Sequence, residues 1–300
     1  MCNFTETENG TELNMKNTGY ALVFGSVTIL GLPLNVVSLW ILLRRHSLTS
    51  PNAVFMVHLA FSDLLLVISL PMRAYFYATG TWPLSPMACI WITMLFRNNV
   101  RSSSIFITFI CVDRLLAVVY PLRSRHIRTP SNAWKSAAFV WLVVIVVNIP
   151  ESVGLSRFLN RYNGSACFEF RCHMRSPQSY FQAVLVSIML AINVVCTALV
   201  SWTLHRQLSD SVRINNKVNV MLIFVMNLMM FAVFFLPASL ALLFESWRPA
   251  FTALICLASV NCCLDPLLYY FSFDGFWRRK EEVDTSLPRQ QLNTVQTEFA

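Results

Sequence analysis

The sequence predicts an all-α membrane protein whose seven helices cross a bilayer and are followed by a short amphipathic eighth helix. Hydrophobic residues make up 56% of the 300 residues and charged residues only 13%, whereas soluble domains carry about 25% charged residues. The apolar residues also gather in long blocks, most of them at or above the ~20 residues that a helix needs to cross a bilayer. These blocks are 20–43, 53–77, 87–119, 133–150, 179–203, 218–244 and 251–272.

Helices are the expected spanning element, because lipid offers no hydrogen-bond partner to an open backbone. The strands of a membrane barrel would instead appear as shorter, alternating segments. The chain should therefore divide into an extracellular tail (1–19), a seven-helix membrane domain (20–272) and an amphipathic helix with a cytoplasmic tail (273–300).

The basic residues indicate which side of the membrane each loop occupies, because short cytosolic loops are enriched in Lys and Arg. They follow spans one, three, five and seven, which places the N-terminus outside the cell. The same bias accounts for the net charge of +8 without a nucleic-acid partner. Three N-glycosylation sequons fall on the outer side. The basic residues are Arg44, Arg45, Arg123, Arg125, Arg128, Arg206, Arg213, Arg278, Arg279 and Lys280, and the sequons begin at Asn3, Asn9 and Asn163.

Spans one and two each hold polar residues that the bilayer interior penalises. Asn35 lies within span one and needs a polar partner inside the bundle. Asp63 is a lone carboxylate in span two, so a cation, a proton or hydrogen bonds must neutralise it. Arg73 lies near the outer end of span two, where the simplest interpretation is a side chain that snorkels to the interface.

Span three holds charged residues at two depths. Arg97 and Arg101 are four residues apart, so they share one face of a helix. Because snorkelling alone does not explain two arginines so far inside a span, we expect them to face a water-filled pocket, with an internal ion pair as the alternative. Asp113 and Arg114 lie at the membrane boundary, where a charged pair is costly unless it serves a function.

The segment 151–177 is predicted to be a long outer loop with four arginines and two glutamates. This excess of arginine departs from the usual bias and suggests an anionic ligand, with pairing to Glu151 and Glu169 inside the loop as the alternative. Of the nine cysteines, five lie inside spans and should serve packing. The other four lie on the outer side, where disulfides form, and are Cys2, Cys89, Cys167 and Cys172.

Spans six and seven contain short motifs around a proline. Span six ends its motif with Phe235-Leu236-Pro237, and the proline should bend the helix because it interrupts the backbone ladder. Span seven contains Asn261 and then Asp265-Pro266, with Tyr269 three residues further on.

Four motifs, in the expected order and on the expected spans, resemble those of rhodopsin-like G protein-coupled receptors. The resemblance covers 20–280 and implies that Arg114 pairs with Asp113 at rest and is released to a heterotrimeric G protein on activation. The motifs are Leu-Ala-x-x-Asp ending at Asp63, the pair Asp113–Arg114, the proline motif ending at Pro237, and Asp265-Pro266-x-x-Tyr269. The implied switch residues are Asp113, Arg114, Phe235, Pro237, Asp265, Pro266 and Tyr269.

The same resemblance implies a plasma-membrane glycoprotein with a disulfide between Cys89 and Cys167, which leaves Cys2 and Cys172 as a candidate second pair. It implies no cofactor except an allosteric sodium ion. The sodium ligands would be Asp63, Asn35, Ser103, Asn261 and Asp265. Arrestin is an expected further partner, because the polar last twenty residues offer hydroxyl groups for phosphorylation.

Within the family, the Leu-Pro-x-Arg segment ending at Arg73 and the stretches 119–128 and 261–266 resemble lysophosphatidic acid receptors of the purinergic-like branch. The implied ligand is an anionic lipid, with Arg73 and Arg248 as basic contacts and Arg97 and Arg101 as deeper positive charges. A nucleotide or a small carboxylate is the alternative ligand. A transporter, as a different class, would show inverted repeats, and no enzyme motif is present.

Overall fold

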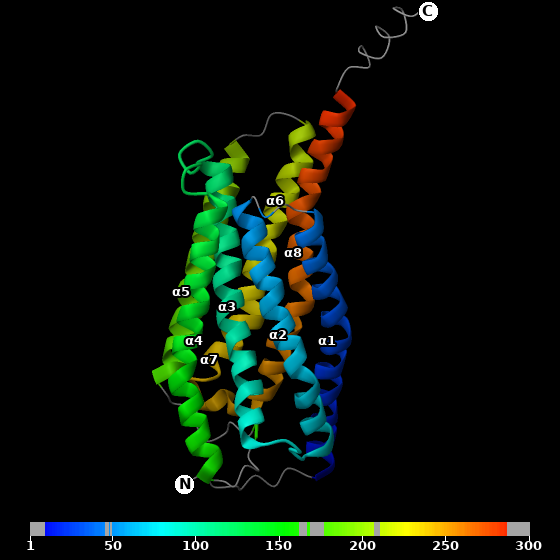
Figure 1. The fold of residues 1–300 in the computed structure, drawn as a ribbon, viewed down its shortest axis with the longest axis vertical. Coiled ribbons are helices and arrows are strands. Elements are labelled where there is room, and N and C mark those ends of the chain that lie inside the picture. The colour runs from blue at the N-terminus through cyan, green and yellow to red at the C-terminus, as the bar shows by residue number, and fades with distance from the viewer. Residues whose placement is uncertain are drawn as a thin grey trace, which may run out of the picture.

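The computed structural model describes residues 10–45, 48, 50–161, 167–168, 177–206 and 211–286. Within these ranges, seven helices are long and apolar enough to cross a membrane, as the sequence predicts. They stand side by side along the long axis of the molecule and form one elongated bundle (Figure 1). The spans are Met15–Arg44, Pro51–Thr79, Pro86–Val119, Pro130–Asn160, Ser179–Arg206, Val220–Leu240 and Phe251–Tyr269.

The first five spans are single helices, the sixth is made of three successive elements, and the seventh occupies the first part of α8. The elements, in chain order, are α1 (Gly10–Arg45), α2 (Pro51–Thr79), α3 (Pro86–Val119), α4 (Pro130–Arg161), α5 (Pro177–Arg206), α6 (Ser211–Met229), a π-helical turn η2 (Met230–Phe235), α7 (Leu236–Leu240), a 3₁₀ turn η3 (Glu245–Ala250) and α8 (Phe251–Ser286).

Local sequence explains where α2 and α3 begin. Each starts at a proline, Pro51 or Pro86, which has no backbone N–H to leave unsatisfied in the first turn. The serine before each proline caps the helix, because Ser50 Oγ and Ser85 Oγ each accept a hydrogen bond from the backbone N–H three residues on (3.2 and 3.3 Å). α2 ends at Thr79 and is capped by Gly80, whose φ of 68° is a conformation that favours glycine.

The two ends of the bundle can be named by what lies there. At the lower end in Figure 1, α3 begins at the disulfide between Cys89 and Cys167, and we call this the disulfide end. At the upper end, α3 finishes shortly after Asp113 and Arg114, and we call this the Arg114 end. The disulfide was predicted from the family resemblance and is confirmed.

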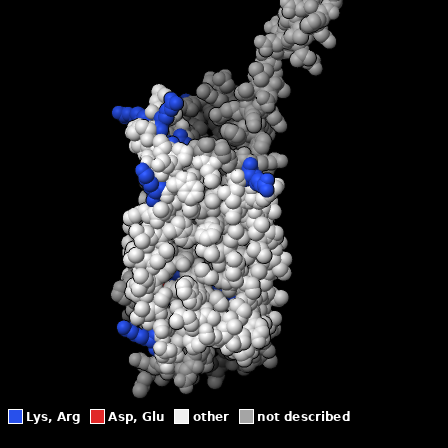
Figure 2. Space-filling view, viewed as in Figure 1, with Lys and Arg blue, Asp and Glu red and all other residues white. Residues whose placement is uncertain are grey.

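α3 lies at the centre of the packing, in contact with α2, α4, α5 and α6. The outer faces of the other helices are apolar, which suits contact with lipid tails. On α1 and α4, for example, exposed side chains include Leu22, Ile29, Trp40, Phe139, Leu142 and Ile145. On the face drawn in Figure 2, most cationic side chains gather toward the Arg114 end, above a broad band of uncharged residues.

The proline motif of the sixth span interrupts its helix, as predicted. The hydrogen-bond pattern changes to a π-helical turn over Met230–Phe235 and returns to α-helical at Leu236. Pro237 follows at once and cannot donate to the ladder, which accounts for the irregular turn before it. Phe235 is fully buried here and packs edge-on against Phe231, with ring centroids 5.5 Å apart.

Three boundaries differ from the sequence prediction. α1 begins at Gly10, inside the predicted tail. Span four was expected to end at 150, but α4 continues to Arg161, so Glu151 lies in a helix and not in a loop. The segment expected to form a separate amphipathic helix from 273 onward instead continues the seventh span without a break, because α8 runs to Ser286.

Candidate functional site

A cavity lies inside the bundle toward the disulfide end, between α2, α3, α4, α5, α7 and α8. The space not filled by protein atoms, with the open mouth included, is about 580 Å³. Much of its lining is apolar, and its charged lining residues come from α2, α3 and α4. The apolar residues are Phe96, Val100, Ala238, Leu242, Phe251 and Ile255, and the charged ones are Arg73, Arg97, Arg101 and Glu151.

Arg73 is a buried cation that is not in an ion pair with any described residue. Only 1% of its surface is exposed, so it does not snorkel to the interface. Among the described residues, no carboxylate lies within ion-pair distance of its guanidinium, and none accepts a hydrogen bond from its Nε or Nη1. A buried charge without a partner is costly, so this side chain is suited to hold an anion that enters the cavity.

Two aromatic rings hold the Arg73 guanidinium in place. Its Cζ lies 4.4 Å from the ring centroid of Phe168 and 4.9 Å from that of Phe96. Such cation–π contacts stabilise a desolvated guanidinium by about 1–2 kcal/mol each. Phe168 has a φ of 63°, a left-handed conformation that costs an L-residue about 1–2 kcal/mol. The disulfide at Cys167 and the edge-on ring of Trp82, 5.4 Å away, hold it there.

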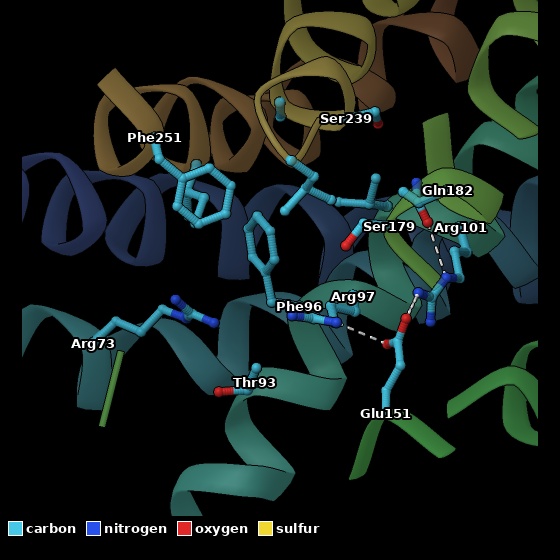
Figure 3. A pocket seen from close by; sticks show the side chains of 14 residues that line it. Arg73, Thr93, Phe96, Arg97, Arg101, Glu151, Ser179, Gln182, Ser239 and Phe251 are labelled. Atoms are coloured by element: carbon cyan, nitrogen blue, oxygen red, sulfur yellow. Dashed lines mark hydrogen bonds and ion pairs between the residues drawn. The ribbon is translucent and has the colours of Figure 1, made fainter. Parts of the chain in front are cut away.

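Arg97 and Arg101 are paired to one carboxylate, that of Glu151 on α4 (Figure 3). Arg97 Nη1 lies 3.0 Å from Glu151 Oε2, and Arg101 Nη2 donates a hydrogen bond to Glu151 Oε1. The structure therefore combines the two alternatives from the sequence: these arginines line the cavity and also form an internal ion pair. The alternative in which Glu151 pairs with arginines of its own loop does not hold, because both of its carboxylate oxygens lie against arginines of α3.

The two arginines differ in how firmly the protein holds them. Arg101 Nε donates to Gln182 Oε1 (2.9 Å) on α5, and its Nη1 donates to Asn148 Oδ1 (2.6 Å) on α4. With Glu151 as the third partner, Arg101 ties α3 to α4 and α5, and only 3% of its side chain is exposed. The side chain of Arg97 is 27% exposed and points into the middle of the cavity, on the side toward Arg73 (Figure 3).

Arg248, the other predicted ligand contact, lies in η3 between α7 and α8. Its side chain is outside the described residues, as are the sequons at Asn3, Asn9 and Asn163 and the cysteines Cys2 and Cys172. The five predicted packing cysteines, Cys111, Cys196, Cys256, Cys262 and Cys263, are free and lie within the spans.

The predicted sodium site lies in the middle of the bundle, between α2, α3 and α8. Asp63 is fully buried, and its Oδ1 accepts a hydrogen bond from Asn99 Nδ2 (2.9 Å). Asn99 also donates to Ser103 Oγ (3.1 Å). Asp265 is fully buried and interacts with Asp63 across the bundle. Asn99 was not among the residues predicted for this site, although the run of polar residues beside Ser103 in span three was a signal for it.

Several oxygen atoms at this pair of carboxylates accept no hydrogen bond from the described residues. Among the described residues, nothing donates a hydrogen bond to Asp63 Oδ2 or to either oxygen of Asp265, and Asn261 Oδ1 is equally unpaired. Asn35 Oδ1 is also unpaired among these residues, while its Nδ2 donates to the backbone oxygen of Cys262 (2.7 Å) and so ties α1 to α8. Carboxylate and amide oxygens that share a buried space are suited to a hard cation.

At the Arg114 end, Asp113 is paired with Arg128 and not with its neighbour Arg114. Arg128 Nε lies 2.7 Å from Asp113 Oδ1, and its Nη2 lies 3.0 Å from Oδ2. Consecutive helical side chains point about 100° apart, so they do not face each other. Among the described residues, the ion pair of Asp113 is therefore with Arg128, and the pairing with Arg114 at rest stays a prediction.

The turn after α3 folds back and brings Arg128 beside Asp113, near the end of the helix. Ser124 is buried and donates its hydroxyl to the backbone oxygen of Leu116 (3.2 Å), which holds the turn after α3 against the helix. Among the described residues, nothing accepts a hydrogen bond from Arg114 Nε, which is buried. Tyr269, another predicted switch residue, is also buried, and nothing described pairs with its hydroxyl.

Comparison with known proteins identifies the class of this chain. Residues 34–269 match the family described as 7 transmembrane receptor (rhodopsin family). Lysophosphatidic acid receptor 6 of Gallus gallus is 32% identical over 88% of this chain and 93% of its own length. Lysophosphatidic acid receptor 4 of Mus musculus is 30% identical over 97% and 82%, and lysophosphatidic acid receptor 5 of Bos taurus is 32% identical over 86% and 76%.

The chain therefore belongs to the rhodopsin family of seven-transmembrane receptors. It is a multi-pass membrane receptor, of the class that binds a ligand and acts on a G protein, and it is not an enzyme. Among receptors, it is similar to the lysophosphatidic acid receptors.

The Asp113–Arg128 pair should restrain activation, because it fastens the turn after α3 to the helix that carries Arg114. We expect Asp113→Asn and Arg128→Gln each to raise G protein activation without agonist, by about 2- to 5-fold if the half-buried pair contributes ~0.5–1 kcal/mol. Nucleotide exchange on G proteins in vesicles measures this.

The double variant and a nearby arginine provide the controls for this pair. Asp113→Asn combined with Arg128→Gln should activate no more than either change alone, because both remove one interaction. Arg123→Gln, on an exposed residue of the same turn, should have no effect. Ligand-independent exchange that stays at the wild-type level in both single variants would contradict a restraining role.

Proposed function

We propose that this receptor recognises an extracellular lysophospholipid with a phosphate head, lysophosphatidic acid in the first place, and signals to a heterotrimeric G protein. The observation that carries this proposal is Arg73, a fully buried guanidinium that has no anionic partner among the described residues and borders a largely apolar cavity. The names of the relatives agree with this ligand class.

A lysophospholipid suits both properties of the cavity. Its phosphate can accept paired hydrogen bonds from the planar guanidinium of Arg73, which stays charged when desolvated. Its single acyl chain can lie against the apolar lining, which includes Phe96, Phe251 and Ile255, where burial contributes about 0.8 kcal/mol for each CH₂ group. We propose Arg97 as a second contact of the phosphate and Arg248 as a basic contact nearer the mouth.

A small carboxylate bound to Arg101 is less favoured. Arg101 already has three protein partners, and its side chain is only 3% exposed. A carboxylate there would have to displace Glu151 or one of the two amides, and it would leave the apolar part of the cavity unused.

We propose that the disulfide end of the bundle faces the outside of the cell, with the N-terminus extracellular and glycosylated at Asn3, Asn9 and Asn163. The basic residues of the loops support this orientation, because the ends of α1, α3 and α5 lie together at the opposite end of the bundle (Figure 1). We also propose that arrestin binds the phosphorylated C-terminal tail.

The experiment is a ligand panel on cells that express the chain with an N-terminal epitope, which is stained without permeabilisation to verify orientation and surface expression. We expect a G protein response to lysophosphatidic acid and none to the monoacylglycerol of the same chain, which lacks the phosphate. An equal response to the monoacylglycerol, or a response only to a nucleoside diphosphate or a small dicarboxylate, would overturn the proposal. A missing epitope signal would overturn the orientation.

We further propose that a sodium ion binds between Asp63 and Asp265 and favours the inactive receptor. The unpaired carboxylate oxygens and Asn261 Oδ1 support this fit, and Ser103 lies within the same network. Two buried carboxylates repel each other unless a cation or a proton lies between them. The ion would supply that positive charge, while Asn99 orients the Asp63 carboxylate.

Sodium should therefore lower agonist affinity. Replacing sodium chloride by N-methylglucamine chloride at constant ionic strength should strengthen agonist binding by about 5- to 30-fold, which corresponds to ~1–2 kcal/mol of allosteric coupling. Radioligand competition measures this, and Asp63→Asn should abolish the sodium effect. Agonist binding that is unchanged by the exchange of cations would favour a proton shared between Asp63 and Asp265 instead.

A further inference from the structure

We infer that Glu151 determines the charge of the ligand that this pocket prefers, because it is a resident counter-anion that fixes how much positive charge the cavity offers. This inference rests on the proposed function, in which the cavity binds an anionic head group. It concerns a residue that the sequence placed in a loop and that the fold places opposite α3.

The charged residues that line the cavity carry a net positive charge. Its charged lining residues are three arginines and one glutamate, so among the described residues the formal charge of the lining is +2. The single carboxylate is not exposed to ligand as a free group, because only 3% of the Glu151 side chain is exposed and both of its oxygens lie against arginines. Glu151 therefore removes one positive charge from those that a ligand meets.

Glu151 compensates the charges of the two arginines to different extents. Arg101 is almost fully covered and is also held by Asn148 and Gln182, so it pairs with Glu151 as part of a fixed tie between helices. Arg97 shares the other oxygen of Glu151 but keeps 27% of its side chain exposed, in the half of the cavity that Arg73 enters (Figure 3). A ligand head group thus meets Arg73 and part of the charge of Arg97.

The charge of the lining favours some head groups over others. A phosphate monoester carries a charge of about −1.5 to −2 at neutral pH, which is close to the lining charge, whereas a phosphodiester carries a single negative charge and leaves a cation uncompensated. With Glu151 neutral, Arg97 and Arg101 would each lose their ion pair with it, the lining would gain one positive charge, and the cavity would favour still more highly charged anions. Specificity of this kind is a difference between two affinities and needs no contact between Glu151 and the ligand.

The test compares ligands that differ only in charge. Lysophosphatidic acid and its phosphate methyl ester, with the same acyl chain, are measured for potency on the wild type, on Glu151→Gln and on the charge-preserving Glu151→Asp. We expect Glu151→Gln to raise the preference for the monoester by about 10-fold and Glu151→Asp to leave it near the wild-type ratio. A purely structural role would lower both potencies by the same factor, and an unchanged ratio in Glu151→Gln would overturn the inference.

Arg97→Gln gives the opposite expectation and keeps the inference testable if Glu151→Gln fails to reach the cell surface. Removing that cation should lower the preference for the monoester by a similar factor, because Arg97 supplies the second positive charge. A preference that does not fall would contradict the assigned charge balance.

A second measurement separates this inference from the proposed function. Purified receptor without lipid agonist is heated in orthophosphate or pyrophosphate at matched ionic strength, and the midpoint of thermal unfolding is recorded. Glu151→Gln should gain more stabilisation from pyrophosphate, relative to orthophosphate, than the wild type does. If neither lysolipid activates the wild type but this gain is seen, the proposed ligand is wrong and the role of Glu151 stands; no gain would overturn that role.

Discussion

Arg73→Ala should weaken the response to lysophosphatidic acid by about 30- to 5,000-fold, because loss of a buried charge contact to a phosphate costs ~2–5 kcal/mol. The guanidinium is fully buried between the rings of Phe96 and Phe168. Without it, the phosphate would be desolvated against an apolar wall. The measurement is a concentration–response curve for G protein activation, with surface expression matched between variants.

Two variants make the result specific to Arg73. Arg73→Lys should recover only part of the potency, because an ammonium keeps the charge but not the planar pair of donors. Arg157→Ala, on an exposed residue of α4, controls for loss of positive charge at the disulfide end and should leave potency unchanged. Wild-type potency in Arg73→Ala would exclude Arg73 as the phosphate contact.

Arg101→Met should destabilise the receptor by about 3–5 kcal/mol, the usual cost of removing one partner of a buried ion pair. Glu151 would lose its better-buried cation, and the Asn148 and Gln182 side chains would lose a donor that they share. We expect little surface expression and a clearly lower temperature of thermal unfolding in detergent, measured without ligand so that binding does not contribute.

A second change should rescue part of this loss. In Arg101→Met combined with Glu151→Gln, no buried charge is left without a partner on α4, so the unfolding temperature should rise above that of Arg101→Met alone. Arg97→Met, at the more exposed partner, should cost much less. A double variant as unstable as the single one would show that Arg101 stabilises the bundle through its amide partners and not through Glu151.

Much of the fold follows from the sequence, because crossing a bilayer demands long apolar segments with satisfied backbones. That demand predicted seven helices, and all of them are present. It also predicted that Asp63 would need polar neighbours, and Asn99 provides a hydrogen bond. The family resemblance added the Cys89–Cys167 disulfide and the class of receptor.

The partners of the charged residues were decided only by the tertiary structure. An arginine in a sequence shows that a counter-charge is needed, but not which carboxylate lies within 4 Å of it. Arg101 and Glu151 are 50 positions apart, and Asp113 pairs with a residue 15 positions away instead of the adjacent one. Such pairs depend on how helices are rotated and on how a loop returns, which local patterns do not fix.

The end of the fourth span shows most clearly why the sequence did not predict these charge pairs. Hydropathy places the boundary at 150 because Glu151 is charged, and a charge normally ends a membrane segment. In the folded bundle, Arg97 and Arg101 compensate that charge, so α4 continues and brings Glu151 into the cavity. The composition of one helix determines which of its segments can contact lipid. The charges on neighbouring helices determine where a charged side chain can be buried.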